Sequence, residues 1–174
     1  GLAGPIQVAH CARVIPAPHY SNLDEALLRV GVHLVRMDYM LSEIRLKGNA
    51  YGAWLTYDPR GRILYFGSYR DPHVARTLDV FDGVMDFARQ ANWTQTDIDR
   101  AIIATAKNEE RPIRPQGATS RTLYRHISGI TPAIREQHFE QLRSATSESV
   151  QRTLLELLEA NYDRGAVCVV ASRE

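Results

Sequence analysis

The segment that decides the fold is AYGAWLTYDPRGRILYFGSY, residues 50–69. Apolar and polar side chains alternate on both sides of its central Asp-Pro-Arg-Gly, and this alternation predicts two β-strands, about Ala50–Tyr57 and Arg62–Tyr69. Pro59 presets the backbone of a type I turn, and Gly61 is expected to take the left-handed position after it. The segment therefore predicts an antiparallel hairpin.

A long amphipathic helix is expected before the hairpin. Ser21 or Asn22 is the expected cap at its start, and Gly48 is the expected end. Apolar side chains recur at steps of three and four and give one buried face: Leu27, Val30, Leu34, Met37, Leu41 and Ile44. Residues 5–15 predict one more strand before this helix, and Pro16 is expected to end that strand.

Helices are expected to dominate the rest of the chain. Capping residues begin four of them: Asp71, Thr94, Thr131 and Thr146. Residues 109–117 are expected to form a loop, a short helix after it ends at Gly129, and residues 166–171 are expected to form a buried strand. The order strand, helix, hairpin, helices, strand is typical of an α+β fold, an antiparallel sheet with helices packed mainly on one face.

Length and composition restrict the function classes. The chain has 174 residues, and we expect the whole length, 1–174, to form a single domain. A net charge of +1 excludes a generally basic nucleic-acid-binding protein, and no apolar run approaches the ~20 residues that cross a bilayer. We therefore expect neither nucleic acid nor a membrane as partner, and a soluble protein of the cytoplasm or, alternatively, of an organellar matrix.

No metal-binding or nucleophile motif is present. Neither H-E-x-x-H nor H-x-x-E-H occurs, so no metal site is expected in this chain. His33 is expected to pack beside the apolar face of the long helix, and His138 to lie on a solvated helix face. Cys11 and Cys168 are expected to be buried free thiols, with a disulfide as the less favoured alternative. An independent hydrolase that uses Ser68 or Cys11 is the weakest functional hypothesis, because no G-x-S-x-G is present.

One pair of residues could build a site. Arg45 lies at the end of the predicted helix, and Tyr51 opens the hairpin after a Gly48-Asn49 turn. A link this short can turn a guanidinium and a phenol into one cleft, where they could hold a peptide carbonyl or the oxyanion that forms when the carbonyl is attacked. In the alternative interpretation Arg45 neutralises the end of the helix and Tyr51 packs on the sheet. Spacing alone favours this alternative.

The pair lies within an ordered set of motifs. RLKGNAYG at 45–52 resembles the R-x-x-G-G-A-Y-G segment of presequence proteases, which belong to the pitrilysin/insulinase superfamily of zinc peptidases. SYRDP at 68–72 matches a motif that follows the family's hairpin, and RPQG at 114–117 and SGIT at 128–131 resemble later blocks in the same order. Asn49 stands where the family usually has glycine, a mild departure because asparagine tolerates the left-handed conformation.

The resemblance implies a metallopeptidase domain of the LuxS/mitochondrial-processing-peptidase-like fold, the last of four similar domains in a longer chain. Zn²⁺ and the catalytic glutamate of H-x-x-E-H would belong to the first domain, with zinc-bound water as the nucleophile. The family's arginine and tyrosine carry over to Arg45 and Tyr51, which would bind substrate backbone and stabilise the tetrahedral intermediate, with Gly48 and Asn49 beside them. The implied partners are the N-terminal half of the same peptidase and unstructured peptide substrates, and the fragment alone would be inactive.

A second hypothesis is a non-catalytic peptide-binding or scaffolding domain of the same superfamily, in which several members have lost the metal site. An intact H-x-x-E-H upstream would favour the peptidase, and a degraded one would favour the scaffold. In either case the face that packs on a neighbouring domain is expected to be apolar, and its exposure would drive self-association.

Overall fold

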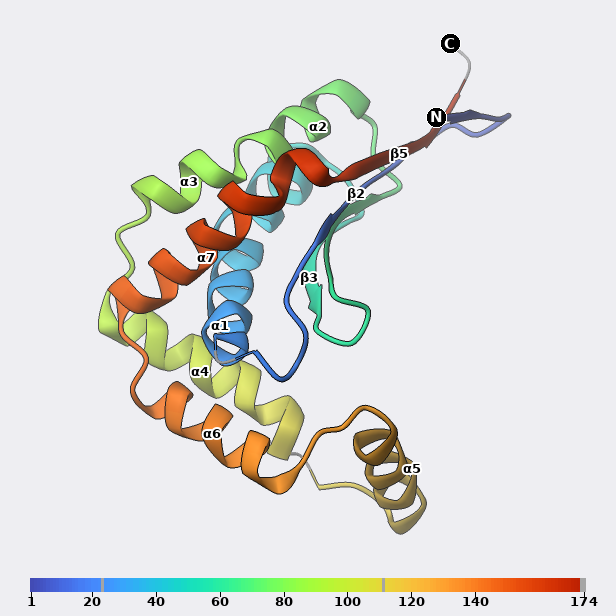
Figure 1. Ribbon diagram of the computed structural model, residues 1–174. Helices are drawn as coiled ribbons and strands as arrows, with labels where there is room; N and C mark the ends of the chain where they lie inside the picture. Colours follow the sequence, from blue (N-terminus) through green and yellow to red (C-terminus); the bar gives the residue numbers. More distant parts are fainter. Residues whose placement is uncertain (23, 111, 173–174) are drawn as a thin grey trace.

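The fold is organised around a five-stranded sheet, and the computed structural model describes residues 1–22, 24–110 and 112–172 (Figure 1). The spatial order of the strands is β1-β5-β2-β4-β3. Their bounds are β1 Leu2–Ala3, β2 His10–Pro16, β3 Gly52–Asp58, β4 Ile63–Tyr69 and β5 Ala166–Ala171. Neighbouring strands are antiparallel except β1 and β5, which pair in parallel.

Helices cover one face of this sheet, with α1 next to the strands and α7 packed on α1 (Figure 1). Their bounds are α1 Glu25–Val35, η1 Arg36–Leu46, α2 Val74–Asp82, α3 Val84–Gln90, α4 Gln95–Glu110, α5 Pro115–Ile127, α6 Pro132–Arg143, α7 Ser147–Asn161 and the 3₁₀ turn η2 Tyr162–Arg164. This arrangement confirms the predicted α+β class with helices mainly on one face. No helix of the described residues is long and apolar enough to cross a membrane.

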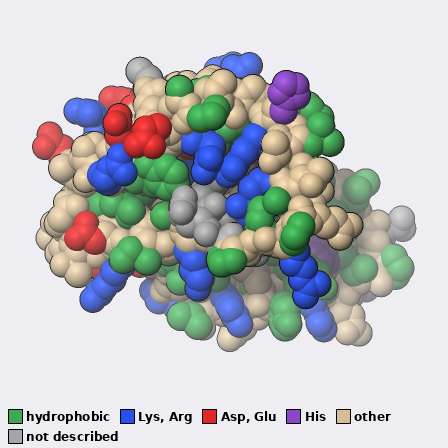
Figure 2. Space-filling view, turned by 90° about the horizontal axis from the view of Figure 1, so that it is seen from below, with side chains coloured by type: hydrophobic (Ala, Val, Ile, Leu, Met, Phe, Trp, Pro, Cys, Tyr) green, Lys and Arg blue, Asp and Glu red, His purple; other side chains and the backbone are tan. Residues whose placement is uncertain are grey.

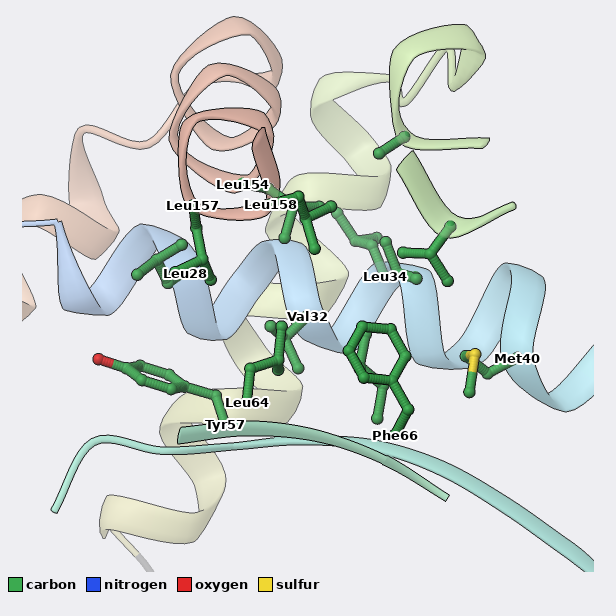
Figure 3. Packing of buried hydrophobic residues seen from close by; sticks show 14 of the residues in the cluster. Leu28, Val32, Leu34, Met40, Tyr57, Leu64, Phe66, Leu154, Leu157 and Leu158 are labelled. Carbon is green, nitrogen blue, oxygen red and sulfur yellow. The ribbon is translucent and has the colours of Figure 1, made fainter. Parts of the chain in front are cut away.

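The core forms between the hairpin and α1, and α7 closes it from the other side (Figure 3). Alternate residues of the hairpin strands face the helices, including Leu55, Leu64 and Phe66, which are at most 1% exposed. Burial of side chains of this size contributes about 1.5–3 kcal/mol each. The alternation that predicted the hairpin is therefore also the pattern that anchors it.

The turn of the hairpin differs from the expectation. Arg62 takes the left-handed conformation, with φ of 56°, and Gly61 does not. The Asp58 carboxylate accepts the N–H of Arg60 at 3.0 Å and so fixes the start of the turn. A Cβ on Gly61 would lie 2.9 Å from that carboxylate, so a larger residue there would displace the Asp58 side chain.

The long helix is present, but its winding changes halfway. Asp24 takes the N-cap position, and the side chain of Asn22 accepts its N–H at 2.8 Å. The α-helical winding of α1 gives way to π-helix in η1, where the N–H of Lys47 reaches back five residues to the carbonyl of Ser42 at 2.9 Å. Such segments are rare and occur frequently at functional sites.

The predicted loop at 109–117 is shorter in the structure. Residues 109 and 110 continue α4, residue 111 lies outside the described residues, and α5 begins at Pro115. The helix expected to start after Asp71 is interrupted at Gly83, which separates α2 from α3.

The two terminal strands also correct the sequence analysis. The strand predicted at 5–15 is confirmed only from His10 onward, as β2, and the separate strand β1 lies before the predicted range. β5 was expected to be buried, but residues 166–168 are exposed, because β2 flanks them on one side and β1 reaches only the end of the strand. Cys168 is therefore exposed rather than buried, whereas Cys11 is 1% exposed. Cys168 pairs in register with the neighbour of Cys11, so the two side chains point to opposite faces and both thiols are free.

The prediction of a solvated His138 is wrong. His138 is 8% exposed, and its Nδ1 lies 3.1 Å from Oε2 of Glu25, which is fully buried. Arg29 pairs with the other oxygen of Glu25, and the Tyr20 ring lies 4.3 Å from the imidazole. This cluster joins α6 to α1 across the helical layer.

Candidate functional site

The candidate site begins where η1 ends. A Cβ on Gly48 would lie only 2.5 Å from the carbonyl oxygen of Ile44, so the turn can close this tightly only at a glycine. Asn49 follows with φ of 59°, as the sequence analysis expected, and the N–H of Ala50 donates to the same carbonyl at 3.1 Å. The strand β3 therefore starts at Gly52, seven residues after Arg45.

Arg76 of α2 hydrogen-bonds two carbonyls at the end of η1. The guanidinium of Arg76 donates to the carbonyl oxygens of Lys47 at 3.0 Å and Glu43 at 3.4 Å. Arg45 is exposed and makes no hydrogen bond or ion pair with the described part of the chain. Arg45 lies in the last turn of η1, where its charge suits the helix end, and its guanidinium is open to a further partner.

Tyr51 is exposed but held in place. Its side chain is 68% exposed, so the sheet does not cover it. Its N–H donates to the carbonyl of Arg70 at 3.3 Å, and its ring meets the Tyr69 ring edge-on at 5.8 Å. The Arg70 guanidinium carbon lies 5.7 Å from the ring centroid. No described residue hydrogen-bonds the phenol oxygen, which leaves it available to a ligand.

The turn after β4 fixes the position of these contacts. Asp71 is 1% exposed and accepts from the Thr77 hydroxyl at 2.6 Å and the His73 N–H at 2.9 Å. Its main chain also exchanges two hydrogen bonds with Ala9, at 2.7 and 2.9 Å. Arg70, directly before it, adopts φ of 49°. The SYRDP segment is therefore a rigid support beside Tyr51.

The four predicted site residues lie together on one short turn. Arg45 and Tyr51 stand exposed at its two ends, Asn49 is exposed between them, and Gly48 is buried and shapes the backbone. Sequence reasoning missed Tyr69 as a neighbour of the site, although the register places it opposite Gly52, next to Tyr51.

The weaker nucleophile candidates are unsuited to catalysis. Ser68 is 2% exposed, and its Oγ accepts the backbone N–H of Cys11 at 3.3 Å. Burial raises the pKa of the Cys11 thiol, which disfavours the reactive thiolate. Both side chains belong to the core between β2 and β4.

The residues that the structure describes do not fit a zinc ion. No group of three histidine, cysteine, aspartate or glutamate side chains gathers anywhere in the described residues. A zinc ion of the superfamily's kind needs three protein ligands, so the chemistry of a metal cannot be assigned to this part of the molecule.

Apart from the turn at 45–51, the surface has a hollow between the tip of the hairpin and α5. It lies on the face where Figure 2 shows Lys and Arg side chains gathered near the centre. Arg29, Arg60, Arg121 and Arg125 line it. The guanidinium of Arg60 lies over the Tyr124 ring at 4.3 Å, and the other three have partners within the protein. Each of these four described arginines thus has a partner, and the Arg60–Tyr124 contact links the hairpin to α5.

Comparisons with known proteins find relatives by sequence and by structure. The family model of the PreP C-terminal domain matches residues 18–173. The mitochondrial presequence protease of Xenopus tropicalis is 32% identical over 148 residues, which are 83% of this chain and 14% of that protein. Presequence protease 1 of Arabidopsis thaliana, named chloroplastic/mitochondrial, is 29% identical over 153 residues, 88% of this chain and 14% of that protein. The chain thus spans about one seventh of the length of these relatives.

Solved structures share the fold at low sequence identity. The inactive domain of an M16 peptidase from Pseudomonas fluorescens superposes with a TM-score of 0.80 at 15% identity, over 99% of this chain and 42% of that one. Pitrilysin superposes with a TM-score of 0.61 at 14% identity, over 97% of this chain and 19% of that one.

Proposed function

The chain belongs to the family of the presequence protease (PreP) C-terminal domain, and we propose that it is the last domain of a longer zinc metalloendopeptidase that degrades unstructured peptides. In this proposal residues 1–174 form one domain that supplies substrate-binding groups, while the zinc ion and its ligands lie outside this chain. The N-terminal half of the same peptidase is the partner that completes the active site, and the domain alone is inactive.

The observation that carries the proposal is the state of Tyr51 and Arg45. A tyrosine side chain that is 68% exposed contributes little buried area to stability. The Tyr51 ring is nevertheless contacted by Tyr69 and Arg70, while no described residue hydrogen-bonds its hydroxyl. Arg45 is an exposed cation without a partner in the described chain, on the same turn. Two free donors on one rigid turn suit the recognition of an acceptor brought by a ligand.

A peptide carbonyl under attack is such an acceptor. Negative charge develops on its oxygen, and a preorganised O–H or N–H donor stabilises that charge more strongly than it binds the uncharged carbonyl. The Tyr51 hydroxyl would donate to this oxygen, and the planar guanidinium of Arg45 would bind a backbone carbonyl of the substrate. Asn49, exposed beside them, would contact the peptide, and Gly48 would serve by closing the turn.

The compartment is part of the same proposal. Relatives named mitochondrial or chloroplastic support an organellar matrix as a location of the parent, beside the cytoplasm that composition alone favours.

Turnover of an unstructured peptide by the full-length parent tests this function. Tyr51→Phe removes one donor and is expected to lower kcat by about 10²- to 10³-fold with a small change in KM. Tyr65→Phe, in the middle of β4, is the matched control and should leave kcat unchanged. Unchanged turnover in Tyr51→Phe would show that the catalytic role is wrong.

The alternative, a non-catalytic peptide-binding or scaffolding domain, agrees with solved neighbours that are described as inactive peptidase domains. It predicts a parent that binds the peptide without cleaving it. Tyr51→Phe would then weaken binding, as measured by fluorescence anisotropy, and no product would form with either protein.

A further inference from the structure

We propose that Arg70 is a positioning residue for Tyr51, and that its guanidinium holds the phenol ring in the orientation in which the hydroxyl meets the substrate. The inference rests on the proposed function of Tyr51. The guanidinium carbon lies 5.7 Å from the centroid of the Tyr51 ring, within the range of a cation–π interaction. Tyr69 supplies the edge-on contact, so the ring has both a cationic and an aromatic neighbour.

The backbone conformation of Arg70 is set by the turn after β4. Its φ of 49° lies in the left-handed region, which glycine or asparagine adopts more easily than arginine. This conformation lies between the strand residue Tyr69 and the anchored Asp71, and it accompanies the approach of the guanidinium to the Tyr51 ring. The case for the guanidinium therefore rests on that ring contact, and the positive φ decides which substitution can test it.

Arg70 is also fixed by what surrounds it. Its carbonyl accepts the N–H of Tyr51, and Asp71, the next residue, is anchored to Thr77 and Ala9. Arg70 makes no ion pair with a carboxylate of the described residues. Its guanidinium lies instead over the Tyr51 ring. Main chain and side chain of Arg70 thus hold two different parts of the same tyrosine.

Arg70→Gly tests this role without disturbing the turn. Glycine adopts the positive φ freely, so the backbone is retained while the guanidinium is lost. Arg62→Gly is the matched control, because Arg62 is exposed with φ of 56° at the opposite end of the hairpin. In the full-length parent, Arg70→Gly should lower kcat about two- to fivefold, the equivalent of an exposed cation–π contact, with KM nearly unchanged. Arg62→Gly should change neither.

Two further measurements separate positioning from a general structural effect. In a Tyr51→Phe background, Arg70→Gly should produce no additional fall in kcat, because the hydroxyl that it orients is absent. With 3-fluorotyrosine incorporated at position 51, the ¹⁹F resonance should shift in Arg70→Gly and stay in place in Arg62→Gly. The ¹⁹F spectrum requires no turnover and therefore reports on Arg70 even in a metal-free protein.

The outcomes are distinct. A wild-type kcat in Arg70→Gly, an unmoved ¹⁹F resonance, or an equal loss of kcat in the Tyr51→Phe background would each overturn the positioning role while leaving the function of Tyr51 intact. Unchanged turnover in Tyr51→Phe alone would overturn the proposed function, and the ¹⁹F shift would still decide whether Arg70 orients the ring.

Discussion

Substitution of Gly48 by alanine should damage the site more than any other single methyl group added near it. The new Cβ would lie 2.5 Å from the carbonyl oxygen of Ile44 and 3.0 Å from that of Glu43, both main-chain atoms of the preceding helical turn. The turn must move by roughly 0.9 Å to bring the closer of these contacts to an ordinary 3.4 Å. The neighbouring atoms belong to the main chain, so they cannot swing aside as the end of a side chain can.

Overpacking of this kind costs about 1–3 kcal/mol, which corresponds to a fall in Tm of roughly 2–12 °C for a chain of this length. The effect on turnover should be larger than the loss of stability suggests. Arg45 and Tyr51 stand at the two ends of the displaced turn, and a shift of about 1 Å in a catalytic group can lower kcat 10²-fold. Thermal unfolding followed by circular dichroism, together with peptide turnover by the parent, measures the two effects separately.

Gly52→Ala is the control for this experiment. Its Cβ would meet Trp54 at 3.7 Å and Tyr69 at 3.9 Å, which are ordinary contacts, although Gly52 is the direct neighbour of Tyr51. Its Tm should stay within about 2 °C of the wild type, as expected for substitutions without steric conflict. If Gly48→Ala unfolds at the same temperature as Gly52→Ala, the close approach that we infer at the end of η1 does not exist.

Three other predictions follow from the environments of single side chains. Iodoacetamide should alkylate Cys168 in the folded protein and Cys11 only after unfolding, as mass spectrometry can show, because Cys11 is buried and burial raises the pKa of its thiol. Burial and the charge of Arg36 lower the pKa of His33, so on acidification the unfolded chain binds a proton at this imidazole before the folded protein does. The free energy of unfolding should therefore fall as the pH drops below about 6.5, and it should fall less in His33→Gln. Urea unfolding at a series of pH values measures both proteins. The Thr94 hydroxyl and backbone lower the pKa of Asp97, so Thr94→Ala should raise that pKa toward its ordinary 3.8 in an NMR titration, and equal pKa values in the two proteins would contradict the capping geometry.

The parts of the fold that follow from local patterns could be predicted from the sequence. Alternation in the hairpin and spacing in the long helix report which side of each element is apolar, and the buried faces of β3, β4 and α1 agree with them. Met37, predicted on the same buried face, is 49% exposed in η1, where the π-helical winding departs from the α-helical spacing. The cap at Thr94 is also local, since its partner Asp97 is three residues away.

Three of the misses depend on residues far apart in the chain. His138 was assigned to a solvated face because its neighbours are charged, but its partner Glu25 arrives from a helix more than a hundred residues earlier. The apolar side chains of β5 predicted burial, and burial depends on whether another element covers the strand. Register explains the missed neighbours of Tyr51, because only strand pairing places Tyr69 and Arg70 beside it.

Pairing of Leu2 with Val170 in β1 and β5 has a topological consequence, since it brings the first and last described residues to one corner of the sheet (Figure 1). Any segment that precedes or follows this chain therefore leaves from that same corner of the sheet. A covalent join between these ends, with new termini opened at Arg60 and Gly61, would give a circular permutant with the same strand order. In the natural chain the hairpin strands β3 and β4 are close in sequence. In the permutant they would lie at opposite ends of the polypeptide, so their pairing would become a long-range contact.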